Sequence, residues 1–177
     1  MDYIRDYAMY AAIFGWFSFC WFGWAQENPR KSWRVYLGIC SGLGLLVGLL
    51  GVYLSVTNWS AATALSETGA FRNYLIFFYI EVALAGIGGI LLIRFKRTNW
   101  IAPWVALVVG VHFIWLKDVF QDASLYVLAA LLIVISLASI PLSKRLGVAN
   151  SAVTGALSGM TLLAFAVLGL IRFFAAS

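Results

Sequence analysis

The sequence is poor in charged residues, histidine, cysteine and proline. Charged residues make up 11% of the 177 residues, against about 25% in soluble domains, which excludes an ordinary solvated surface. One histidine cannot supply a multi-histidine metal or haem site. The two cysteines, Cys20 and Cys40, are expected to be small buried residues rather than a disulfide. The three prolines fall outside the middle of the long apolar stretches, which are therefore predicted to be uninterrupted helices.

The sequence is rich in apolar residues. They account for 63% of the chain, and the mean hydropathy is +0.94, more than a water-soluble fold of this length can bury. Crossing the hydrocarbon core takes about 20 apolar residues per helix. We therefore predict an all-α integral membrane helical bundle, a single transmembrane domain over residues 1–177. Six spans are expected, at residues 5–25, 35–57, 73–93, 100–116, 123–142 and 150–173.

Basic residues gather in three of the connections between these spans. Residues 26–34, 94–99 and 143–149 hold eight of the twelve Lys and Arg residues. By the positive-inside rule these connections are cytoplasmic, so the N-terminus and the C-terminus are both non-cytoplasmic. The net charge of +5 then reflects topology and contact with anionic lipid. The predicted partner is the lipid bilayer of the plasma membrane, and nucleic acid is not expected as a partner.

Glycines follow helical spacing in two spans. The second span carries Gly38, Gly42, Gly44, Gly48 and Gly51, and the sixth carries Gly155 and Gly159. Small residues let helix backbones approach closely in lipid. These faces predict either packing inside the bundle, which we favour, or the seam of a homo-oligomer.

Two ionisable residues, Glu81 and His112, lie well inside the predicted spans. Such residues are costly in hydrocarbon, so they normally face the interior of the bundle and are functional candidates. Glu81 lies sixteen residues before Arg97, and His112 fifteen after it. An antiparallel pair of helices that turns near Arg97 brings both to nearly the same depth. We therefore predict that Glu81 and His112 line a polar pocket that opens outward, or that they only pin two helices together.

Aromatic residues near this depth extend the candidate site. Trp115 and Tyr79 join Glu81 and His112 as candidates for contact with a substrate or for proton binding. An aromatic and acidic lining suits a small apolar or cationic ligand. We predict no cofactor and no metal, because the sequence offers no matching set of ligands.

A short motif in the fourth predicted span consists of Gly110, His112, Phe113 and Leu116, in the order Gly-x-His-Phe-x-x-Leu. It resembles a pattern in small uncharacterised bacterial multi-pass membrane proteins, in which a Glu in the preceding span, here Glu81, is also similar. The usual continuation after the Leu differs here, where Lys117 and Asp118 follow. The resemblance implies a bacterial plasma-membrane location and brings no known activity.

Three function classes remain open. The first is a transporter or binder of a small molecule that uses Glu81 and His112. The second is an intramembrane enzyme on an apolar or lipid substrate, with the same residues as acid and base. The third is a structural or accessory membrane subunit with no substrate. The sequence has no second carboxylate, metal set or nucleophile motif near the pair, which favours a non-enzymatic role.

Overall fold

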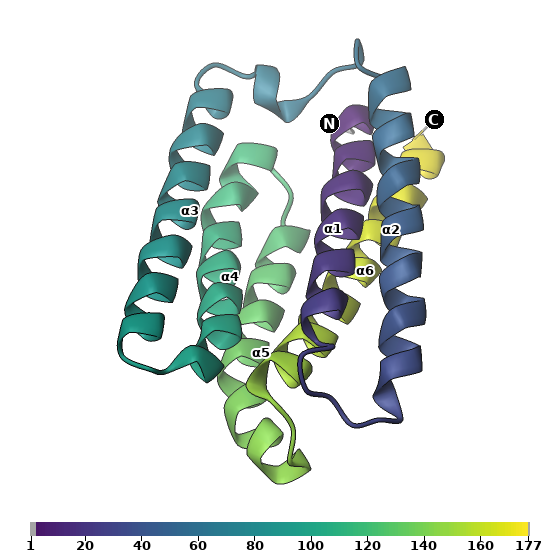
Figure 1. The fold of residues 1–177 in the computed structure, drawn as a ribbon. Helices are drawn as coiled ribbons and strands as arrows, with labels where there is room; N and C mark the ends of the chain where they lie inside the picture. Colours follow the sequence, from purple (N-terminus) through teal and green to yellow (C-terminus); the bar gives the residue numbers. More distant parts are fainter. Residues whose placement is uncertain (1–2, 177) are drawn as a thin grey trace.

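The computed structural model describes residues 3–176, which form six α-helices, two short 3₁₀ helices and no strand (Figure 1). The predicted all-α class is therefore confirmed. The α-helices are α1 (Ile4–Trp24), α2 (Trp33–Thr57), α3 (Ala70–Arg94), α4 (Ile101–Phe120), α5 (Ser124–Leu146) and α6 (Asn150–Ala176). The 3₁₀ helices are η1 (Ala64–Ser66) and η2 (Thr98–Trp100).

Among the described residues, five helical segments are long and apolar enough to cross a membrane: α2, α3, α5, α6 and the segment Thr98–Phe120, which joins η2 to α4. Their mean hydropathy lies between 1.6 and 2.5. The chain is therefore compatible with a multi-pass membrane protein. α1, expected as a sixth span, is not among the five, because its Trp, Tyr, Gly and Ser residues lower its mean hydropathy.

Most helix boundaries lie within a few residues of the predicted spans. The fourth helix runs on to Phe120 instead of ending at residue 116, and Gln121 then turns the chain with a φ of 51°. The fifth helix continues through Pro141 to Leu146. Both extensions carry charged residues, which a count of apolar residues leaves out. The two thiols are free, but Cys20 is exposed, so the expectation that it is buried is wrong.

The helices pack in two groups (Figure 1). α1 packs between α2 and α6, whereas α4 packs between α3 and α5. α6 also contacts α4 and α5, and this joins the groups. The core between them is filled by apolar side chains such as Phe14, Phe113, Leu132 and Leu162. α3 lies at the edge, packs mainly on α4 and has no fully buried residue.

Glycines let two helices approach α1 closely. A Cβ at Gly51 would lie 2.2 Å from the backbone nitrogen of Ala12, and one at Gly155 would lie 2.6 Å from the carbonyl oxygen of Trp21. Gly38 and Gly42, in contrast, have nothing within 4 Å of such a Cβ. Packing inside the bundle therefore accounts for the glycine face of α6 and for part of that of α2, whereas Gly38 and Gly42 of α2 contact no other helix.

The bundle has two distinct ends. Both termini lie at one end together with the connection 58–69 between α2 and α3 (Figure 1). We call this the terminal end. The opposite end holds the α1–α2, α3–α4 and α5–α6 connections. We call it the basic end, because eight of the twelve Lys and Arg residues lie in or beside these connections.

Candidate functional site

The candidate site is built on the antiparallel contact between α3 and α4. Near the basic end, the Trp104 indole of α4 lies over Gly88 of α3, where a Cβ would come within 2.1 Å of Nε1. The indole N–H donates a hydrogen bond of 3.1 Å to the Leu84 carbonyl. Toward the terminal end, Phe77 stacks on Trp115, with ring centroids 6.1 Å apart. These contacts fix the register of α3 against α4.

This register brings Glu81 and His112 together. His112 Nε2 lies 3.4 Å from Glu81 Oε2, with His112 8% and Glu81 19% exposed. The predicted meeting of the two side chains is therefore confirmed, although their role stays a prediction. The separation exceeds the usual 2.7–3.2 Å of an N–H···O hydrogen bond, and the two groups form an ion pair only when His112 is protonated and Glu81 is ionised.

The face of α3 that carries Glu81 is the one predicted from the small residues. Ala85, Gly88 and Gly89, which follow Glu81 at helical spacing, are partly covered, whereas Ile80, Val82 and Ile87 are exposed. A bulky residue at Gly88 would displace Trp104 and separate the helices. The small residues thus hold α3 close enough to α4 for Glu81 to reach His112.

The two aromatic candidates lie in different places. Trp115 is on the same face of α4 as His112, one turn toward the terminal end, and is 48% exposed. Tyr79 lies on the outer face of α3, is 65% exposed and contacts Phe78. The structure therefore groups Trp115 with the pair and leaves Tyr79 apart from it.

A cavity of about 290 Å³ opens beside Trp115, and we call it the terminal-end cavity. Its lining includes Phe77 and Trp115, the carboxylates of Glu67 and Asp118, and the amides of Asn73 and Gln121. Phe77 precedes Glu81 by four residues and Trp115 follows His112 by three, about 6 Å and 5 Å along their helices. The stacked aromatic rings therefore lie between this cavity and the Glu81–His112 pair.

The connection 58–69 covers part of the cavity and is fastened to the first turn of α1. Asp6 is buried, and its carboxylate accepts hydrogen bonds from the Thr63 hydroxyl at 2.5 Å and the Ala64 backbone N–H at 2.8 Å. Arg5 donates to the Trp59 carbonyl at 2.9 Å. Tyr3 donates to Glu67, a cavity residue, at 3.2 Å.

Sequence reasoning missed this role of Asp6, which it counted only among the acidic residues of the outer side. The available signal was an acidic residue in the first turn of an apolar helix, paired with a long polar connection. Nothing in the sequence pointed to Thr63 as its partner.

Within residues 3–176, no three His, Cys, Asp or Glu side chains gather as a metal ion would need. The chain was also compared with protein-family models, curated proteins and solved structures, and none of them matches it. Inference about function therefore rests on the chain's own geometry.

Proposed function

We propose that this chain is a six-span plasma-membrane protein whose termini both face the non-cytoplasmic side. α1 has 21 residues, and at about 1.5 Å per residue such a helix matches a hydrocarbon core of about 30 Å. Its central place between α2 and α6 supports a span over a surface helix. The concentration of Lys and Arg at the basic end supports a cytoplasmic position for that end. The terminal-end cavity then opens outward.

We further propose that the protein binds, and in its full cycle transports, a small organic cation. The observation that carries this proposal is the close approach of Glu81 and His112, which lie next to the Phe77 and Trp115 rings that line the terminal-end cavity. Phe77 and Trp115 offer ring faces to a cation, and Glu67 adds negative charge at the rim, where Asp118 is paired with Lys117. A volume of about 290 Å³ suits a small amine or quaternary ammonium compound.

In this proposal, the Glu81–His112 pair responds to the ligand's charge. A cation that passes the rings meets the Glu81 carboxylate, and a proton competes with it for the same negative charge. His112 lies next to that carboxylate and can take up or release the proton. Binding of the cation is then opposed by protons, as exchange of one cation for one proton requires.

The experiment that tests the proposal measures binding of benzyltrimethylammonium to the purified protein in nanodiscs, with neopentylbenzene as its neutral isostere. We expect the cation to bind more tightly than the isostere, and more tightly at pH 8 than at pH 5. Glu81→Gln should abolish this pH dependence. Trp115→Leu should weaken binding about tenfold, as expected for loss of a desolvated cation–π contact.

Trp16→Leu is the matched control, because Trp16 and Trp115 are both 48% exposed but Trp16 lies on α1, away from the cavity. It should bind the cation as the unchanged protein does. Equal binding of cation and isostere would reject the proposal, as would a Glu81→Gln variant that folds and keeps the full pH dependence. Either result would favour a pair that only pins α3 to α4.

A further inference from the structure

A second hollow lies at the basic end, opposite the terminal-end cavity. It has a volume of about 100 Å³, below the ~300–1,000 Å³ of sites that enclose a whole drug-sized ligand. Its walls come from the end of α1, the η2–α4 segment and the start of α6. A hollow of this size takes a very small molecule or the head of a larger one.

The walls are held by hydrogen bonds between segments far apart in the sequence. The Asn150 amide donates to the Asn99 carbonyl at 2.9 Å and accepts a hydrogen bond from the Ser143 hydroxyl. The Ala149 N–H donates to the Asn28 carbonyl at 3.2 Å. These bonds engage the Asn150 amide group and fix the three connections around the hollow relative to one another.

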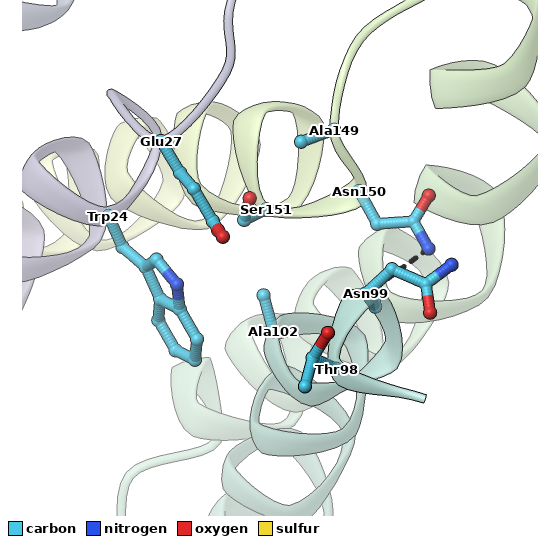
Figure 2. A pocket seen from close by; sticks show the side chains of 8 residues that line it. All are labelled: Trp24, Glu27, Thr98, Asn99, Ala102, Ala149, Asn150 and Ser151. Carbon is cyan, nitrogen blue, oxygen red and sulfur yellow. Dashed lines mark hydrogen bonds between the residues drawn. The ribbon is translucent and has the colours of Figure 1, made fainter. Parts of the chain in front are cut away.

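One side of the hollow is suited to an anionic group. α6, a helix of 27 residues, begins there at Asn150, and its first backbone N–H groups have no partner within the helix. That of Ala152 donates to the Ala149 carbonyl at 3.1 Å, so the N–H groups of Asn150 and Ser151 are the ones available to an anion. Ser151, in the first turn, is only 6% exposed, and its hydroxyl hydrogen-bonds to none of the described residues. Ser151 lines the hollow together with Thr98 of the η2–α4 segment, and Figure 2 shows the two residues on opposite sides of it. The hydroxyl is thus free to bond to a ligand in the hollow.

The other side is suited to a cationic group. Glu27 and Trp24 lie together there, across the hollow from Asn99 and Asn150 (Figure 2). Glu27 forms no ion pair or hydrogen bond with another described residue. A carboxylate beside an indole ring is a favourable place for an ammonium group.

We infer that this hollow binds an aminoalkyl phosphate head, with its ammonium on Glu27 and Trp24 and its phosphate at Ser151, Thr98 and the start of α6. Neither half of the site suits a simple ion, because Glu27 repels a lone anion and the α6 N-terminus repels a lone cation. A zwitterion satisfies both. The head can come from phosphatidylethanolamine, whose tails would leave the hollow for the bilayer, or from free phosphoethanolamine.

The test is native mass spectrometry of the full-length protein released from micelles that contain equal amounts of phosphatidylethanolamine, phosphatidylcholine and phosphatidylglycerol. We expect phosphatidylethanolamine to be retained in preference, because choline cannot donate N–H bonds to Glu27 and glycerol carries no cation. Glu27→Gln and Ser151→Ala should each reduce its retention, Glu27→Gln by about tenfold through loss of a charged hydrogen bond.

Ser158→Ala is the matched control, because Ser158 is also a buried, unpaired serine of α6 but lies outside the hollow. It should retain the lipid as the unchanged protein does. A parallel arm adds free phosphoethanolamine and follows thermal stability. Stabilisation by the free compound without lipid retention would identify a soluble ligand, and lipid retention alone would identify the lipid. Retention of all three lipids in equal amounts, or unchanged binding by both variants, would overturn the inference.

Discussion

At the scale of single residues, the missing side chain of Gly51 sets how closely α2 approaches α1. The position where its Cβ would stand is 2.2 Å from the Ala12 backbone nitrogen, and backbone atoms cannot move aside as a flexible side chain can. Gly42, on the same helix, faces open space. Substitution of either glycine by alanine changes helix propensity in the same way, but only the substitution at Gly51 disturbs close packing.

We predict that Gly51→Ala lowers the free energy of unfolding by about 1–3 kcal/mol, the usual cost of overpacking. SDS titration followed by circular dichroism measures this change. Gly42→Ala should stay within about 0.5 kcal/mol of the unchanged protein, or be slightly more stable. Equal stabilities of the two variants would contradict the close α1–α2 contact.

At the scale of elements, the connection 58–69 depends on α1 for its order. Apart from the short helix η1 it has no regular structure, and Asp6 binds the start of that helix through Thr63 and Ala64. Because Glu67 in the same connection lines the terminal-end cavity, the attachment also shapes the cavity rim.

We predict that Asp6→Ala loosens this connection while the six helices remain folded. Loss of hydrogen bonds to a charged group should speed amide hydrogen exchange at Ala64 and Leu65 by about tenfold or more. Asp118→Ala is the control, because among residues 3–176 the Asp118 carboxylate pairs with neighbouring Lys117 and with no residue of the connection. If exchange at Ala64 and Leu65 is the same in both variants, Asp6 does not hold the connection.

At the scale of the whole molecule, the distribution of Lys and Arg gives a direct test of topology. With six spans and a cytoplasmic basic end, alkaline phosphatase fused after residue 177 should be active, and green fluorescent protein fused there should stay dark. If α1 does not span the membrane, five spans put the two termini on opposite sides. A fluorescent fusion at the C-terminus would reject the cytoplasmic position of the basic end, and a fluorescent fusion at the N-terminus would reject the span by α1.

The sequence predicted the features that depend on local composition or on counting residues from a turn between two helices. The apolar stretches predicted six spans, five of which are helices long and apolar enough to cross a membrane, and nearly equal distances from Arg97 predicted that Glu81 meets His112. The attachment of Asp6 to Thr63 and the hollow around Ser151 escaped prediction. Both join segments distant in the chain, and their partners follow from how the helices pack rather than from any repeat or motif. The exposed position of Tyr79 likewise depends on which way α3 is rotated against α4.

Because α3 lies at the edge of the bundle, the charge of the Glu81 carboxylate affects how easily α3 could move away from α4. α3 packs mainly on α4, and its remaining surface faces outward. If α3 rolled or tilted away, an ionised Glu81 would have to enter hydrocarbon, at a cost of about 2.5–3.5 kcal/mol for a charge at the bilayer centre. A neutral Glu81 would avoid most of that penalty. By this argument, loss of the Glu81 charge would lower the free energy needed to move the outermost helix away from α4.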